Sequence, residues 1–357
     1  MMLPTNPSTW KRERLTTADR PAGPFRVGKL PPEFLSTLLS RAAIEDPRVI
    51  LGPGIGLDCA VVDLGDRFAV YKSDPITFAS DQIGYYLVHV NANDIATTGA
   101  QPLWLLVTLL LPEKGTRAAL PDAIMTQIYD ACRELGIAVI GGHTEITTGL
   151  DRPIAMGTLI GEVARDKLVT PRGASTGDRV LLTKGVPIEA TTLLAREFPA
   201  RLRDALTSTE ITAAQNYLFE PGIGITHDAR TAMKAGCVTA MHDPTEGGIV
   251  TALWELAQAS GKTLRVDPGE IPVPALARRV CEAFGIDPLC ALASGALLLT
   301  VPPSDAAAIC TALEYEHIAC ADIGIVADGR DIVERKTAVG YEAWPRPAVD
   351  DITKAFA

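Results

Sequence analysis

The stretch that decides the fold runs from Leu51 to Pro112 and reads LGPGIGLDCAVVDLGDRFAVYKSDPITFASDQIGYYLVHVNANDIATTGAQPLWLLVTLLLP. It opens with a glycine-rich loop that leads to Asp58, continues through a strand-like run to Asp74, and carries Asp94 near the end of a helix-like run. These carboxylates stand among apolar residues, where a charge without compensation is costly to bury. We therefore predict that they share a ligand, a phosphate group bound through a metal ion.

The helix predicted at 81–98 places Asp94 on its buried side. Its apolar residues recur in steps of four and three along one stripe, the next step falls on Asp94, and Gly99 ends the helix. The position of Asp94 on the helix also allows a second interpretation of its role. Asp94 would then be a buried aspartate hydrogen-bonded to Asn91 or to a loop.

The elements around this helix indicate mixed α/β structure. Strand-like runs at 59–64 and 68–73, separated by Gly65-Asp66, predict a hairpin. A short buried strand at 137–140 leads to the polar run Gly141-Gly142-His143-Thr144-Glu145, where paired glycines allow a ligand to approach the backbone. The other elements expected in this half are helices at 32–41 and 121–135 and strands at 103–111 and 153–163.

The second half contains a helix start suited to an anion. A strand at 238–241 leads into HDPTEGG at 242–248, and a helix follows at 249–260. Gly247 and Gly248 therefore lie at a helix N-terminus, where free N–H groups and the helix dipole favour negative charge. The other elements expected here are strands at 179–183, 296–301 and 322–326, helices at 188–197, 209–218, 229–235, 275–285 and 304–317, and an irregular tail beyond 340.

Length and charge limit the class of protein. The 357 residues suggest a loose N-terminal arm at 1–26, one domain at 27–165 and a second at 175–345. A net charge of −10 disfavours nucleic acid and anionic membrane surfaces as partners. The seven cysteines form no C-x-x-C pair, and no apolar run is long enough to span a bilayer, so we expect a cytoplasmic protein with reduced thiols.

The clustered oxygens favour phosphate chemistry. Carboxylates suit a hard cation such as Mg²⁺, and a cation is needed before an acidic loop can bind a polyphosphate. Phosphoryl transfer asks mainly for metal ions, positioning and positive charge. Lys72 and Lys184 are candidate phosphate contacts, with solvated surface charges as the alternative. A metal-dependent hydrolase that uses His143, His227 and His242 is a further hypothesis.

Five motifs, in order, resemble one known superfamily. GPGIGLDCAVVD, SDP, ANDIATTGAQP, GGHTEIT and HDPTEGG are similar to motifs of the superfamily of aminoimidazole ribonucleotide (AIR) synthetase, thiamine-monophosphate kinase, selenophosphate synthetase and the hydrogenase-maturation protein HypE. The resemblance covers residues 27–326. GKLPPEFL, together with HDPTEGG and FGIDPL, is most similar to the HypE branch.

The resemblance implies a fold and an activity. The fold is α/β (α+β), a two-domain PurM-like fold in which the N-terminal domain forms a dimeric β-barrel and the C-terminal domain is α/β. The activity is ATP- and Mg²⁺-dependent activation of an oxygen of a small substrate by phosphoryl transfer, in a homodimer that works with a maturation partner protein.

The resemblance also assigns roles by position. The metal ligands implied are Asp58, Asp74 and Asp94. The catalytic residues implied are His143, Glu145 and Asp243. The cofactor-binding residues implied are Lys72, Asp74, Asn93, Asp94, Gly141, Gly142, Gly247 and Gly248.

The chain departs from the family pattern at specific positions. Leu57 stands where the family commonly has an acidic residue, and the segment 291–295 lacks the acidic residue usual in HypE. HypE ends in a cysteine that is carbamoylated and dehydrated, whereas this chain ends in DITKAFA and Cys320 is its last cysteine. These departures keep a second hypothesis open, a non-catalytic nucleotide-binding maturation or assembly factor with the same fold.

Overall fold

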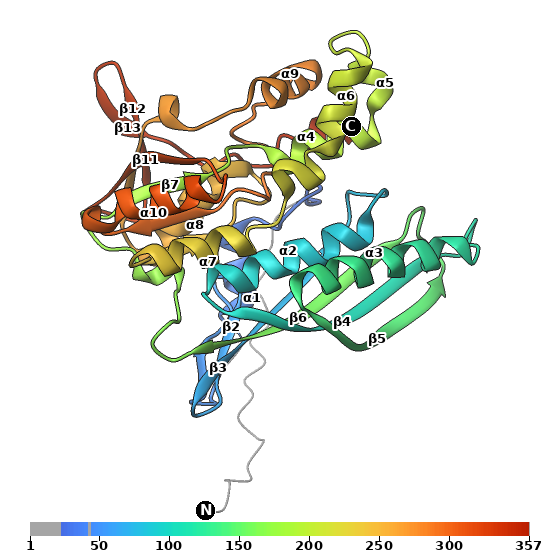
Figure 1. The fold of residues 1–357 in the computed structure, drawn as a ribbon, viewed down its shortest axis with the longest axis horizontal. Coiled ribbons are helices and arrows are strands. Elements are labelled where there is room, and N and C mark those ends of the chain that lie inside the picture. Colours follow the sequence, from blue (N-terminus) through green and yellow to red (C-terminus); the bar gives the residue numbers. More distant parts are fainter. Residues whose placement is uncertain (1–22, 42–43, 357) are drawn as a thin grey trace, which may run out of the picture.

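Two β-sheets with helices packed on them make up the structure. Figure 1 shows the computed structural model, which describes residues 23–41 and 44–356. The N-terminal arm predicted at 1–26 lies almost entirely outside these ranges. Within them, no helix is both long and apolar enough to cross a membrane.

The first sheet has six strands in the order β1-β2-β3-β6-β4-β5, and only the pair β4 and β5 is parallel. The predicted hairpin is confirmed, because β2 and β3 pair antiparallel. The strands are β1 Val49–Leu51, β2 Ala60–Asp63, β3 Arg67–Ile76, β4 Gln101–Pro112, β5 Ala138–Thr147 and β6 Ile154–Ala164.

Helices cover one face of this sheet. After α1 (Pro32–Leu39), the helices α2 (Ile83–Thr97) and α3 (Ala119–Leu135) lie side by side on the sheet, and α7 lies on the other side of α2 (Figure 1). All residues of α2 except Tyr85 are buried, because this helix is covered from both sides. The predicted burial of Asp94 is confirmed, with 2% of the residue exposed.

Strand β5 differs from its prediction. It is ten residues long and mostly exposed, because it is an edge strand that pairs only with β4. The two glycines lie inside the strand rather than in a loop. A Cβ atom on Gly142 would lie 1.8 Å from the carbonyl oxygen of Val107, so the close approach of β4 explains this glycine.

The second sheet has seven strands in the order β13-β12-β9-β11-β7-β10-β8, and only β9 and β12 are parallel. The prediction of an irregular tail beyond 340 is wrong where β12 and β13 form a hairpin. The strands are β7 Arg179–Thr183, β8 Ala240–His242, β9 Thr263–Val266, β10 Leu298–Val301, β11 Cys320–Ala327, β12 Val333–Thr337 and β13 Gly340–Ala343.

Both faces of the second sheet carry helices. Leu253 and Leu256 of α8 share an apolar cluster with Leu182, whereas Ala229 of α7 and Ile309 of α10 share another cluster with the opposite face. The helices of this half are α4 Ile188–Glu197, α5 Pro199–Leu202, α6 Ser208–Asn216, α7 Thr226–Ala235, α8 Gly248–Ser260, α9 Ala275–Phe284, α10 Pro303–Tyr315 and α11 Thr353–Phe356.

The largest apolar cluster joins the two halves of the chain. It combines residues under the first sheet with Ile188 of α4, Val280 of α9 and Ile352 near the C-terminus. The ring of Phe356 lies 5.4 Å from that of Phe78 and 5.0 Å from that of Phe198, centroid to centroid. The C-terminal segment is therefore a packed part of the core.

Lys184 is buried in an ion pair rather than free to bind phosphate. Its Nζ lies 3.2 Å from a carboxylate oxygen of Asp228 and donates a 2.6 Å hydrogen bond to the carbonyl of Gly224. The side chains of Lys184 and Asp228 are only 8% and 2% exposed. The lysine thus fixes the loop after β7 to the start of α7.

Lys184→Met should lower the free energy of unfolding by about 3–5 kcal/mol, because it leaves the buried Asp228 carboxylate without its cation and with only the hydrogen bond from Thr183 Oγ1. Urea unfolding followed by circular dichroism measures this. The matched control is Lys262→Met, since Lys262 pairs at 3.7 Å with an Asp328 side chain that is 84% exposed and should contribute less than about 1 kcal/mol. Equal losses in both variants would contradict the prediction.

Glu189, in the first turn of α4, is a buried titratable group. It is 7% exposed and its Oε2 has no hydrogen-bond partner among the described residues. Burial, opposed by a hydrogen bond from Ser294, raises the pKa of Glu189 from 4.5 to about 8.

This carboxyl group should make stability fall as pH rises from 4.5 towards 8, because the folded protein holds a proton that the unfolded chain has released. The slope is at most about 1.4 kcal/mol per pH unit. Glu189→Gln should remove this slope, so its stability relative to wild type should rise from pH 5 to pH 8 in urea unfolding. A difference independent of pH would contradict the assignment.

Candidate functional site

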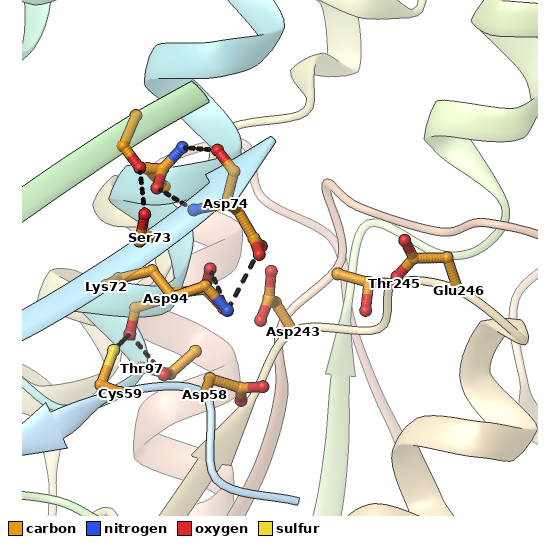
Figure 2. A network of polar contacts seen from close by, with 12 residues as sticks. Asp58, Cys59, Lys72, Ser73, Asp74, Asp94, Thr97, Asp243, Thr245 and Glu246 are labelled. Atoms are coloured by element: carbon orange, nitrogen blue, oxygen red, sulfur yellow. Dashed lines mark hydrogen bonds and ion pairs between the residues drawn. The ribbon is translucent and has the colours of Figure 1, made fainter. Parts of the chain in front are cut away.

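Four carboxylates from four separate segments converge at one place. Asp58 precedes β2, Asp74 lies on β3, Asp94 on α2, and Asp243 follows β8. Figure 2 shows these side chains, the acidic cluster, pointing toward one another with Lys72 beside them. The first three were predicted as metal ligands and the fourth as a catalytic residue, and the structure brings all four together.

Several oxygens of the acidic cluster lack donors. Among the described residues, neither carboxylate oxygen of Asp243 has a hydrogen-bond partner, and Asp58 Oδ2 and Asp94 Oδ2 make only ion-pair contacts. Asp94 and Asp243 are 2% and 0% exposed, so water does not satisfy them freely. Buried oxygens without donors are unfavourable unless a cation binds them. Their chemistry fits a hard divalent ion.

The pKa values of the acidic cluster are consistent with a bound divalent cation. Burial and the neighbouring carboxylates raise the pKa of Asp243 to about 6 and that of Asp94 well above its usual range. Burial also raises the pKa of Asp74, although Lys72 opposes the shift. A divalent cation would compete with these protons, so metal affinity should increase with pH.

Lys72 is the cation inside the acidic cluster. Its Nζ lies 3.2 Å from Asp74 Oδ2 and 3.1 Å from Asp94 Oδ2, and its side chain is 14% exposed. Burial alone would lower the pKa of Lys72, but the carboxylates raise it well above its usual value. The alternative of a solvated surface charge is therefore wrong for Lys72.

The two asparagines of α2 have structural partners. The backbone N–H of Asp74 donates to Asn91 Oδ1, which fixes β3 to the helix. Asn93 Nδ2 donates to the carbonyl of Ile223 at 2.7 Å, and Asn93 Oδ1 accepts from Ile225 N–H at 2.9 Å. Asn93 thus ties α2 to the second half of the chain, and its predicted cofactor contact stays a prediction.

Two charged residues of the site, Lys29 and Glu255, were missed in the sequence, and His242, named there only for the hydrolase hypothesis, also belongs to the site. His242 Nδ1 lies 3.5 Å from Asp58 Oδ2, and its Nε2 lies 3.1 Å from Glu255. Burial alone would lower the pKa of His242, but these carboxylates raise it to about 9, so the ring is an imidazolium at neutral pH. Lys29 Nζ lies 3.3 Å from Glu246, 3.8 Å from Glu255 and 3.1 Å from Thr245 Oγ1.

The contacts of His242 bear on which residues could hold a metal ion. Ligand atoms of Asp58, His242 and Asp243 lie within 4.8 Å of one another. Both ring nitrogens of His242 already have partners, since Nδ1 lies 3.0 Å from the carbonyl oxygen of Asp243 and Nε2 lies 3.1 Å from Glu255, and this favours the carboxylates as ligands. The hydrolase hypothesis is not supported, because His143 pairs with Glu145 and His227 with Glu316, away from His242.

His143 and Glu145 lie away from the acidic cluster within one chain. Both are on β5, two strands from the β3 residue Asp74, in the order β3-β6-β4-β5. His143 is in register with Thr108, whereas Asp74 is in register, through Gly157, with the buried Val107. Because side chains alternate along a strand, His143 and Glu145 project from the face opposite to Asp74. Their roles, and those of Gly141 and Gly142, stay predictions.

The N-terminus of α8 binds an anion from the chain itself. Gly247 N–H donates a 2.5 Å hydrogen bond to Asp350 Oδ2, and Gly248 N–H donates to the carbonyl of Thr245. Both glycines have positive φ, and a Cβ on Gly248 would lie 2.5 Å from the carbonyl of Leu289. The backbone therefore requires these glycines, and their predicted contact with a cofactor stays a prediction.

Solved structures share this fold. The crystal structure of Escherichia coli HypE matches with a TM-score of 0.70 at 22% identity, covering 90% of this chain and 98% of that one. HypE in complex with ATP matches with a TM-score of 0.63 at 24% identity, covering 86% and 92%. A HypE–HypF complex matches with a TM-score of 0.66 at 22% identity, covering 80% and 93%.

Sequence comparisons point to the same relatives. The carbamoyl dehydratase HypE of Bradyrhizobium diazoefficiens is 31% identical over 281 residues, which cover 76% of each chain. The HypE of Cupriavidus necator is 28% identical over 275 residues, which cover 74% of each chain. Residues 56–163 match the family description "AIR synthase related protein, N-terminal domain", and residues 175–336 match its C-terminal counterpart. The two matches span most of the chain, which therefore belongs to the AIR synthase related protein family.

Proposed function

We propose that this protein is an ATP- and Mg²⁺-dependent enzyme that activates an oxygen of a small substrate by phosphoryl transfer, as a HypE-like member of its family. The acidic cluster carries this proposal, because four carboxylates converge beside a buried lysine and three of them have buried oxygens that lack hydrogen-bond partners among the described residues. The names of the relatives, carbamoyl dehydratases, and the HypE structure with ATP support the same chemistry.

The residues of the site divide into metal ligands and cations. Asp58, Asp74 and Asp94 would hold Mg²⁺, which prefers oxygen ligands and bridges carboxylates to phosphates. Lys72 and Lys29 lie where they can neutralise the remaining phosphate charge. Bound ATP supplies the phosphoryl group that is transferred, and the protein contributes positioning and electrostatic stabilisation.

Asp243 is the proposed general base for the acceptor oxygen. Both of its carboxylate oxygens are without a hydrogen-bond donor, and its pKa of about 6 lies near the range in which a base works best at neutral pH. Asp243 belongs to the second half of the chain, so the acceptor would lie between the two halves.

The acidic cluster is complete although position 57 holds a leucine instead of the acidic residue common in the family. The side chain of Leu57 packs against the main apolar cluster, and the four carboxylates remain in place without an acidic residue there. No observation favours the alternative of a non-catalytic assembly factor. That alternative predicts nucleotide binding with no consumption of ATP across a panel of small oxygenated metabolites, and clear turnover of one metabolite would exclude it.

Asp58→Asn and Lys72→Met should each weaken binding of Mg²⁺ and a non-hydrolysable ATP analogue at least about tenfold, since a charge-assisted contact contributes about 1.5–3 kcal/mol. Isothermal titration calorimetry measures the affinity, and chelation of Mg²⁺ should abolish binding to the wild-type protein.

The matched control for this experiment is Asp322→Asn, which makes the same chemical change at a carboxylate that pairs with Arg179 on the second sheet. It should bind like wild type. Undiminished affinity in Asp58→Asn and Lys72→Met, or binding of the analogue that does not depend on Mg²⁺, would overturn the proposed site.

The uncovered face of the first sheet supports the proposal of a homodimer. The sheet face opposite α2 and α3 is uncovered in Figure 1 and carries large exposed side chains. Along strands β3, β4 and β6, these exposed residues alternate with the residues that are buried under the helices. We propose that a second copy packs on this face to close the dimeric barrel that the family resemblance implies. The exposed residues are Tyr71, Trp104, Leu106 and Met156.

Leu106→Glu should convert the dimer into a monomer of 37.9 kDa, because the charge would be buried at the interface. Sedimentation velocity measures the mass at micromolar concentration. Tyr315→Glu, at an 83% exposed position on α10, is the control and should stay dimeric. A wild-type protein that sediments as a monomer would contradict the dimer.

A maturation partner protein completes the proposal. One structural neighbour is a complex of HypE with HypF. We propose that this chain likewise works with a partner protein that supplies or receives its small substrate.

A further inference from the structure

We propose that Cys310 and Cys320 form a reversible dithiol–disulfide site, separate from the acidic cluster. Cys310 lies on α10 and Cys320 is the first residue of β11, and their sulfur atoms are 3.1 Å apart. Closing a disulfide bond of about 2.05 Å needs a movement of only about 1 Å.

The pair stands apart from the other thiols. Among the described residues, no other contact between two cysteine sulfurs is found. Cys59, Cys132 and Cys281 are buried singly in the apolar core. Cys310 and Cys320 are both half-buried at the edge of an apolar cluster, so a small reagent can reach them while the surrounding structure keeps them together.

The two sulfurs lie close enough to act in sequence. Cys310 Sγ donates a hydrogen bond to Cys320 Sγ at 3.1 Å. The thiolate is the nucleophile in thiol chemistry, so after one cysteine of the pair has reacted, the other lies within reach as the resolving thiol.

The oxidant we assign is a low-molecular-weight disulfide such as oxidised glutathione. The thiolate of one cysteine of the pair attacks one sulfur of that disulfide, forms a mixed disulfide and releases one thiolate. The other cysteine loses its proton and attacks the sulfur of the first, which forms the protein disulfide and releases the second thiolate. The protein loses two hydrogen atoms in total, and one small disulfide becomes two small thiols.

A disulfide between Cys310 and Cys320 would connect two elements close to the Lys184–Asp228 ion pair. Cys320 pairs with Thr183 at the end of β7, and the neighbouring Ala319 carbonyl accepts a hydrogen bond from Lys184 N–H. A disulfide would tie α10 to the strand that supports the Lys184–Asp228 ion pair. Strands β7 and β10 separate β11 from β8, which leads to Asp243, so the site is distinct from the acidic cluster.

The test incubates the full-length protein with excess oxidised glutathione, blocks free thiols with an alkylating reagent and digests it with a protease specific for glutamate. Cleavage after Glu282, Glu314, Glu316 and Glu334 places the two cysteines on separate peptides, 283–314 and 317–334. We expect these peptides to be joined, the intact protein to lose about 2 Da relative to the reduced form, and dithiothreitol to reverse both changes.

Two variants control the assignment. Cys310→Ser should abolish the joined peptide, whereas Cys290→Ser should leave it unchanged and also excludes Cys290, which lies on the same peptide as Cys310. Near-ultraviolet circular dichroism checks that Cys310→Ser is folded. The proposal is overturned if oxidation gives only glutathione adducts or no joined peptide in the wild-type protein, or if the joined peptide depends on Cys290.

Discussion

The convergence of four carboxylates on one buried lysine is the contact on which the rest of this structure depends. Bringing Asp58, Asp74, Asp94 and Asp243 together opposes folding, because burial and mutual repulsion both disfavour their charged forms. Carboxyl groups whose pKa values are raised can keep their protons, and Lys72 forms ion pairs with Asp74 and Asp94. Both effects offset part of this cost. Such an arrangement persists only if the surrounding packing fixes it, and α2, buried on nearly all sides, provides that packing.

The acidic cluster also depends on how the two halves of the chain pack. Three of its carboxylates come from the first half, and Asp243 comes from the second. Asn93 fixes α2 to residues 223–225, and His242 links Asp58 to Glu255 of α8. Because the largest apolar cluster also combines both halves, the acidic cluster exists only when they are docked. Docking of the two halves is therefore required to assemble the acidic cluster.

What could be predicted from the sequence was local. The spacing along α2 placed Asp94 on a buried face, and alternating runs around Gly65 gave the β2–β3 hairpin, because both signals arise within a few residues. Lys29 and Glu255 were missed because they reach the site through contacts between remote segments. The exposure of β5 was missed because an apolar run does not reveal which strand will lie at an edge. The side of the sheet from which His143 projects depends on strand register, which spacing alone does not give.

The start of α8 shows how far local reasoning reaches. The motif predicted a helix N-terminus that favours an anion, and the structure has an anion there, the carboxylate of Asp350 from the other end of the chain. The second oxygen of Asp350 accepts from Ile352 N–H at 2.7 Å, and the residue is 7% exposed. A phosphate at Gly247 would therefore replace an existing hydrogen bond, so only the difference between the two bonds would contribute to its affinity. The acidic cluster, in which four buried oxygens lack donors among the described residues, is for this reason the stronger determinant of where a metal-bound phosphate would bind.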